Sequence, residues 1–232
     1  MRAAAAQRAR ATARASTWAL VHDERRALVE LLEGFDPEHW EQPSLCPGWS
    51  VHDVAAHLVD NARTTTPRLL AAMARARFDF DRQNQQGVDR ERGADPARTV
   101  ARLREVAGRT SGPPAPLDSR LVEEVLHGED IRRPLGYAHR YAPEAVDRSL
   151  RYQARTRVGL GGGRERVAGL TLRPDDRAPD AAGAGQPTGD DDGPVVTGPA
   201  LSLLLVVSGR GTALDDLSGP GLDLLRDRVR RP

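Results

Sequence analysis

The sequence has no lysine and a single cysteine, Cys46, among its 232 residues. One cysteine excludes an internal disulfide framework and a cysteine-rich zinc module, and it favours a reducing compartment. All 34 basic residues are therefore arginines, and 33 acidic residues balance them to a formal net charge of +1. Because this balance creates no overall electrostatic field, neither nucleic acid nor an anionic membrane is expected as a partner.

Long hydrophobic runs are missing as well. The longest run, around residues 203–207, is far shorter than the roughly 20 residues that a membrane-spanning helix needs. Residues 1–15 are rich in alanine and arginine and lack the hydrophobic core of a signal peptide. We therefore predict a cytoplasmic protein, either a monomer or a homodimer, that begins with a disordered basic tail over residues 1–15.

Hydrophobic residues at helical spacing dominate residues 16–158, so this region is predicted to be an antiparallel helix bundle. A strong helix start is expected at Ser50, where Asp53 completes a capping box. Residues 79–93 are polar and are predicted to form a loop. The resulting fold class is mainly α.

The character of the sequence changes near residue 159. Residues 167–172 and 195–196 are predicted to be short strands, and a helix that is apolar almost all round follows them and must be buried. Residues 173–194 are rich in Asp, Gly, Ala and Pro, which is typical of a mobile insertion. We therefore predict a small α+β C-terminal domain over residues 159–232.

Glu123 and His127 are four residues apart on the predicted helix over residues 117–136. At about 100° per residue, this spacing places both side chains on one helix face, where two such ligands can hold one metal ion. The pair alone is common on solvated helices, so a metal site needs a third ligand from another helix. His57 is the candidate, whereas His52 is rotated about 140° away from it on the same helix.

Two further residues near this group allow alternative interpretations. Asp130 lies about one turn after His127, where its carboxylate either orients an imidazole from outside the ligand set or pairs with Arg132 or Arg133 at the surface. Cys46 is more consistent with a small packing residue in its loop than with a catalytic thiol.

Two motifs contain these candidates. The first reads Trp40-x-x-Pro-Ser-Leu-Cys-Pro-Gly-Trp-Ser-Val-x-Asp-x-x-x-His57-Leu, and the second reads Glu123-x-x-x-His127-x-x-Asp130 and continues into Ile-Arg-Arg-Pro-Leu-Gly. Both resemble the mycothiol-dependent maleylpyruvate isomerase family of the DinB-like superfamily. The later segment that ends in Ser-Gly-Arg210 is similar to the C-terminal domain of that family.

The resemblance implies a DinB-like four-helix bundle that holds a divalent metal, usually zinc, on His57, Glu123 and His127. It also implies mycothiol or a similar low-molecular-weight thiol as cosubstrate and a small electrophile as substrate. In the isomerase, addition of the thiolate to the substrate double bond permits rotation before elimination. Arg210 is the nearest counterpart of a family arginine that receives a substrate carboxylate.

Three functions are compatible with these features. The leading one is a metal- and thiol-dependent isomerase or S-transferase. The second is a metal-dependent hydrolase of thiol conjugates, with water at an open metal position. The third is a non-enzymatic metal-bundle scaffold. The sequence favours an enzyme.

Overall fold

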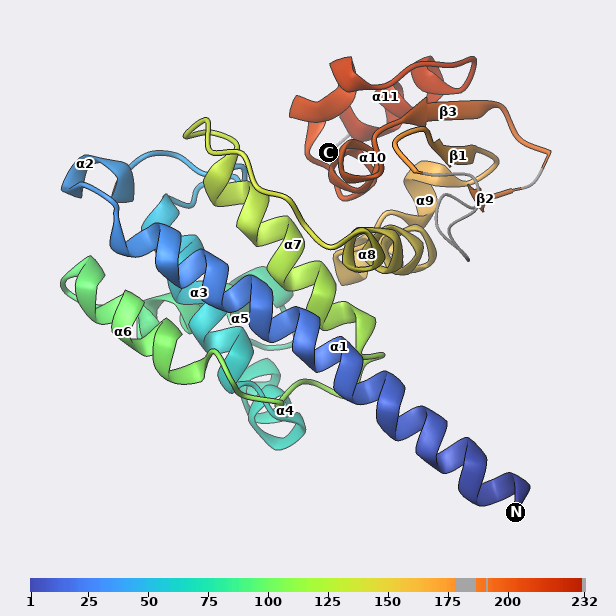
Figure 1. Ribbon diagram of the computed structural model, residues 1–232. Coiled ribbons are helices and arrows are strands. Elements are labelled where there is room, and N and C mark those ends of the chain that lie inside the picture. The colour runs from blue at the N-terminus through green and yellow to red at the C-terminus, as the bar shows by residue number, and fades with distance from the viewer. Residues whose placement is uncertain (178–186, 191, 231–232) are drawn as a thin grey trace. The chain divides into compact units, whose positions relative to one another are not determined.

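The structure is a computed structural model of the full chain, and it describes residues 1–177, 187–190 and 192–230. The chain divides into two compact units, residues 1–140 and residues 141–232 (Figure 1). Residues 178–186 and 191, ten of the 22 residues of the predicted mobile insertion over residues 173–194, lie outside the described residues.

The N-terminal unit is built from helices. Their bounds are α1 Arg2–Glu33, α2 Pro37–Trp40, α3 Val51–Arg63, α4 Thr66–Arg75, α5 Phe80–Glu91, α6 Pro96–Val106 and α7 Asp118–Arg132. Helix α3 packs against α5, α6 and α7, and α1 packs against α6 and α7. Helix α3 is therefore central to the unit, and its hydrophobic face forms much of the core together with residues of α1 and α6.

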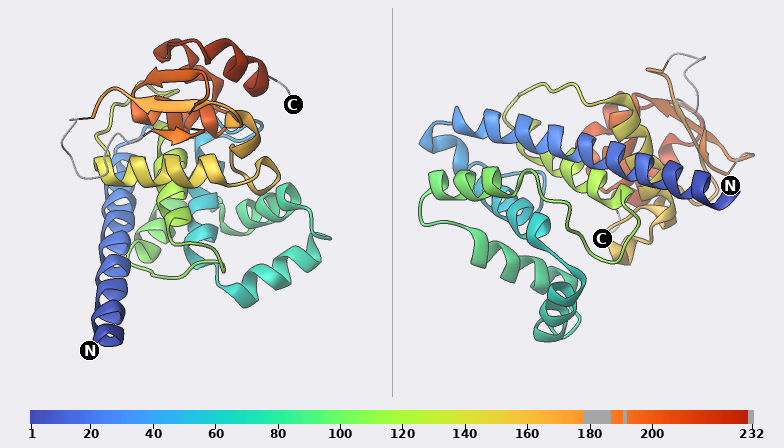
Figure 2. Two further views of the ribbon diagram at one scale, coloured as in Figure 1. Left: turned by 90° about the vertical axis from the view of Figure 1, so that its right-hand side faces the viewer. Right: turned by 60° about the horizontal axis from the view of Figure 1, so that its bottom comes forward.

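Helix α1 begins at Arg2, so residues 2–15, which the sequence predicted to be a disordered tail, are helical instead. Alanine and arginine are both strong helix formers, which accounts for the helix in the absence of packing. Residues 4–16 are exposed, and the first turns of α1 extend beyond the other helices of the unit (Figures 1 and 2).

Helix α5 occupies most of the segment that the sequence predicted as a loop, so that prediction was wrong. Its buried residues are Gln83, Gly87, Val88 and Glu91, which recur at helical spacing. Only one of the four, Val88, has a large hydrophobic side chain, so the sequence shows almost no hydrophobic periodicity over this helix. Ion pairs hold the helix in place, because Arg63 of α3 lies 2.6 Å from a carboxylate oxygen of Glu91.

The start of α3 is as predicted. The backbone N–H of Ser50 donates to Oδ2 of Asp53 at 2.9 Å, and the Ser50 hydroxyl accepts from the backbone N–H of Asp53 at 3.3 Å. This capping box fixes where the helix begins. It therefore also fixes which face of α3 carries His57, two turns further along.

The C-terminal unit is a small α+β structure. Its elements are α8 Pro143–Arg155, η1 Val158–Leu160, α9 Arg164–Val167, β1 Thr171–Pro174, β2 Thr188–Gly189, β3 Val195–Gly198, α10 Ala200–Val207, η2 Gly211–Asp216 and α11 Leu222–Arg230. Strand β1 lies between β2, with which it pairs antiparallel, and β3, with which it pairs parallel. Helix α10 is buried and packs against α8. The sequence had assigned the α8 segment to the bundle, whereas this packing places it in the second unit.

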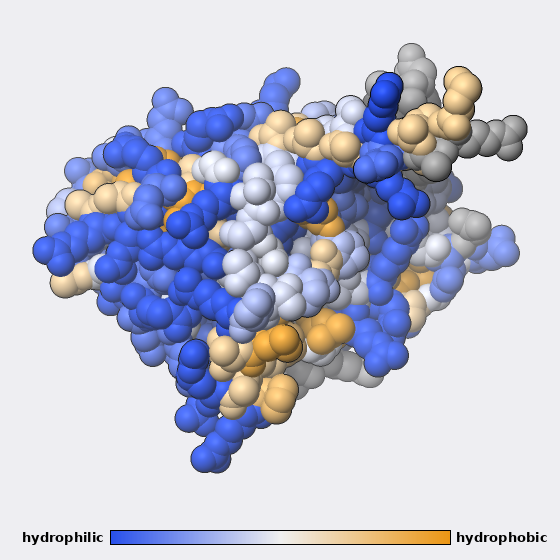
Figure 3. Space-filling model, turned by 90° about the horizontal axis from the view of Figure 1, so that it is seen from below, coloured by the Kyte–Doolittle hydropathy of each residue, from blue (hydrophilic) through white to orange (hydrophobic). Residues whose placement is uncertain are grey.

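The predicted fold class, a mainly α bundle with a small α+β appendage, is confirmed. Hydrophilic side chains cover most of the face seen in Figure 3, and hydrophobic side chains form small patches on it. Within the described ranges, no helix combines the length and the apolar character that crossing a membrane requires.

Candidate metal centre

The structure brings His57, Glu123 and His127 together. His57 comes from α3, and the other two come from successive turns of α7, which packs against α3. Oε2 of Glu123 lies 3.4 Å from Nε2 of His57 and 3.3 Å from Nε2 of His127. One ligand-type atom from each residue lies within 4.8 Å of those from the other two. The arrangement thus has the composition and the spacing of a three-ligand metal site.

The cluster is half-buried, and burial and contacts among its members shift their pKa values. Burial lowers the pKa of His57 below its ordinary value. For Glu123, burial acts to raise the pKa, but hydrogen bonds with His127 and His57 and the charge of Arg120 outweigh it and hold the pKa well below its usual range. The Glu123 carboxylate is therefore ionised and the His57 imidazole is neutral, which are the protonation states that a metal ion needs of these two ligands.

Asp130 orients His127. Its Oδ2 lies 2.8 Å from Nδ1 of His127, and the carboxylate is completely buried. Of the two interpretations that the sequence allowed, the structure therefore shows the orienting contact. Burial acts to lower the pKa of His127, but hydrogen bonds with Asp130, Cys46 and Glu123 raise it well above its ordinary value. Because Nδ1 is engaged with Asp130, Nε2 is the atom that faces Glu123.

Cys46 is closer to this group than the sequence indicated. Its thiol donates to Oδ2 of Asp130 at 3.0 Å, and Sγ lies 3.7 Å from Nδ1 of His127. The backbone N–H of Leu45 donates to the carbonyl oxygen of Asp130 at 3.1 Å, so the loop before α3 is fastened to α7. Sequence reasoning missed this contact because no local pattern links residues more than 80 positions apart.

Trp49 and His52 have separate roles around α3. The Trp49 ring lies 5.1 Å from the His57 ring and forms one wall of the cluster. His52 faces away, as predicted, and its Nε2 lies 2.8 Å from the Thr99 hydroxyl. His52 is therefore a buried core residue that takes no part in the metal-type cluster.

Arg210 belongs to the C-terminal unit, in the turn after α10. It is half-exposed, and its guanidinium donates to the carbonyl oxygen of Ser208 at 2.9 Å. The pKa of the neighbouring Arg166 is lowered, first by the burial of that residue and second by the positive charge of Arg210. A role for Arg210 in receiving a substrate carboxylate stays a prediction.

Comparison with known proteins relates the N-terminal unit to a known domain. Residues 21–132 match the family model for the mycothiol maleylpyruvate isomerase N-terminal domain. The matched stretch contains His57, Glu123 and His127 and ends before the C-terminal unit begins. The resemblance carried by the two sequence motifs is thus confirmed for the N-terminal unit.

Solved structures share the fold of this chain. The crystal structure of the mycothiol-dependent maleylpyruvate isomerase aligns with a TM-score of 0.58 and 18% sequence identity over 89% of this chain and 92% of that chain. A variant of that enzyme with one histidine changed to alanine aligns with a TM-score of 0.57 at the same identity and coverage. At this identity the likeness establishes the fold. Among curated proteins, none matches the chain.

Proposed function

We propose that this chain is a divalent-metal enzyme that uses a low-molecular-weight thiol, mycothiol or a similar one, either to isomerise a small electrophile or, as an S-transferase, to join the thiol sulfur to it. The observation that carries the proposal is the convergence of His57, Glu123 and His127 within a domain of the mycothiol maleylpyruvate isomerase family. A cytoplasmic location fits this function and stays a prediction.

The distances within the cluster fit a metal site. The two Nε2 atoms lie 3.4 and 3.3 Å from Oε2 of Glu123, at the long end for a hydrogen bond. Tetrahedral metal bonds of about 2.0–2.2 Å place two donor atoms about 3.3–3.6 Å apart. The three residues therefore fit a divalent ion, zinc in the first place, although nickel, manganese and iron also accept such a donor set.

Each residue around the cluster would have its own role in the proposed reaction. His57, Glu123 and His127 would hold the ion, Asp130 orients the His127 ring, and the Trp49 ring lies beside that of His57. A bound divalent ion lowers the pKa of a thiol that coordinates it, so that thiolate is available near neutral pH. Arg210 is proposed to receive a carboxylate of the substrate, because a guanidinium binds carboxylates bidentately.

Turnover assays distinguish this proposal from its alternatives. The metal-loaded protein is incubated with maleylpyruvate, with and without mycothiol, and product is followed by absorbance. Activity that requires both thiol and metal supports the proposal. Thiol-independent hydrolysis of a mycothiol conjugate would point to the hydrolase instead, and a metal-loaded protein inactive in both assays would point to a scaffold.

A further inference from the structure

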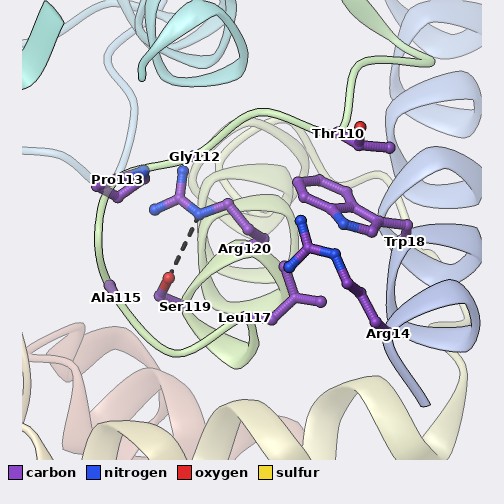
Figure 4. Close-up of a pocket in the computed structure, with 9 residues that line it drawn as sticks. All are labelled: Arg14, Trp18, Thr110, Gly112, Pro113, Ala115, Leu117, Ser119 and Arg120. Atoms are coloured by element: carbon purple, nitrogen blue, oxygen red, sulfur yellow. Dashed lines mark hydrogen bonds between the residues drawn. The ribbon is translucent and has the colours of Figure 1, made fainter. Parts of the chain in front are cut away.

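A second group of polar side chains lies in the N-terminal unit, between α1 and the loop that leads into α7 (Figure 4). It surrounds a cavity of about 110 Å³. Arg14 and Trp18 border it from α1, Thr110 from the loop, and Ser119 and Arg120 from the first turn of α7. Among the described residues that line it there are two guanidinium groups and no carboxylate. The cavity is therefore positively charged and rich in hydrogen-bond donors.

Trp18 offers a donor for which the protein supplies no acceptor. The side chain is 6% exposed, and its Nε1 is buried without a hydrogen-bond partner in the described part of the chain. An indole N–H can only donate, and an unpartnered buried donor destabilises a folded protein. In Figure 4 the indole ring stands beside the guanidinium of Arg14. What this pair lacks is an acceptor.

Arg14 has no acidic partner among the residues that the structure describes. Its guanidinium lies 6.0 Å from the centre of the Trp18 ring, in a cation–π contact. The residue is exposed on the outer half of α1, so its long side chain can shift to admit a ligand oxygen between itself and Nε1 of Trp18. A guanidinium beside an indole N–H supplies two donors from which one oxyanion can accept.

Arg120 borders the cavity as well, and hydrogen bonds hold its side chain in place. It is 5% exposed, its Nε donates to the Ser119 hydroxyl at 3.3 Å, and its NH1 donates to Oδ1 of Asn61. Oε1 of Glu123 lies 3.9 Å from its NH2, which leaves the charge only partly compensated.

We propose that this cavity binds a small oxyanion, a carboxylate or a phosphate group, whose oxygens accept from Nε1 of Trp18 and from the Arg14 and Arg120 guanidinium groups. The volume suits a group of that size, equal to a few water molecules. The site adjoins the His57, Glu123 and His127 cluster through the contact of Arg120 with Glu123, and the proposal does not depend on a metal there.

The indole N–H resonances of the ¹⁵N-labelled protein provide the test, because each of the three tryptophans contributes one peak and Trp18→Phe identifies that of Trp18. Inorganic phosphate and acetate are titrated separately, with chloride added to keep the ionic strength constant. We expect a saturable shift of the Trp18 peak while those of Trp40 and Trp49 stay in place. Saturation with phosphate only, or with acetate only, identifies the anion class.

Arg14→Gln and Arg10→Gln make a matched pair, because both residues are exposed on α1 and both changes remove one positive charge. Arg14→Gln should weaken anion binding about tenfold, the loss expected for one charge-assisted hydrogen bond, and Arg10→Gln should leave it unchanged. Equal weakening by both variants would mean general charge attraction and would overturn the proposal. So would a Trp18 peak that moves without saturation, or not at all, with both anions.

Discussion

Nδ1 of His127 lies 2.8 Å from Oδ2 of Asp130, a carboxylate that is completely buried. The same oxygen accepts the Cys46 thiol at 3.0 Å. This contact fixes the orientation of the imidazole and directs Nε2 toward Glu123. The proposed metal centre therefore depends on a residue that would not itself touch the metal.

Asp130→Asn tests this dependence, because it removes the charge and keeps the shape. We expect metal affinity to fall about 10–100-fold, the usual effect of losing such a carboxylate partner, in competition with a chromophoric chelator. Glu129→Gln is the matched control, since Glu129 is the adjacent buried carboxylate and contacts Arg133 rather than the cluster. Equal affinities for both variants would show that Asp130 does not support the site.

The capping box at the start of α3 should contribute measurably to stability. Ser50→Ala removes the side-chain cap and is expected to lower the free energy of unfolding by about 1 kcal/mol, as measured by urea denaturation. Thr65 is the control, because it occupies the same position before α4 but makes no capping bond with its side chain. Thr65→Ala should therefore have little effect, and a similar loss in both variants would contradict the assignment.

The approach of α5 to α3 requires a glycine at position 87. A Cβ there would lie 2.5 Å from Oδ2 of Asp60, and Asp60 is itself held by Arg90 at 2.6 Å. Gly87→Ala should lower the free energy of unfolding by about 1–3 kcal/mol, although alanine is the better helix former. At Gly108 an added Cβ meets no atom within 4 Å. Gly108→Ala should be well tolerated, and the reverse order of stabilities would refute this packing.

His52 should make the protein less stable in mild acid. Burial first, and the charge of Arg92 second, lower the pKa of His52 below its ordinary value of about 6.5. Between the folded pKa and 6.5 the unfolded chain binds the proton more readily, so the free energy of unfolding falls as the pH falls through that window. In His52→Gln this contribution is absent. The stability difference between wild type and variant should therefore shrink from pH 8 to pH 5 in urea titrations, and a constant difference would contradict this account.

Local chemistry explains which features the sequence could predict. The Ser50 and Asp53 capping box and the four-residue spacing of Glu123 and His127 are short-range rules, and the structure contains both arrangements. The convergence of His57 on that pair was expected from the shared helix faces and from the family motifs.

Other features depend on contacts that no local pattern reveals. Helix α5 buries Gln83 and Glu91 together with Gly87 and Val88, and Glu91 pairs with Arg63 of α3, so its hydrophobic pattern is weak. The Cys46 thiol meets Asp130 only because the loop before α3 folds onto α7. The unpartnered Trp18 Nε1 likewise becomes visible only when α1 and the loop before α7 are placed together.

The central claim is that His57, Glu123 and His127 hold one divalent metal ion. It is tested most directly by elemental analysis of protein purified without a histidine tag or chelator, as wild type, Glu123→Gln and Glu129→Gln, with circular dichroism to verify folding. The account predicts about one equivalent of zinc or a similar ion per chain in wild type and in Glu129→Gln, and its loss in a folded Glu123→Gln. A wild type that is metal-free and does not take up added zinc, or a Glu123→Gln variant that retains its metal, would contradict it.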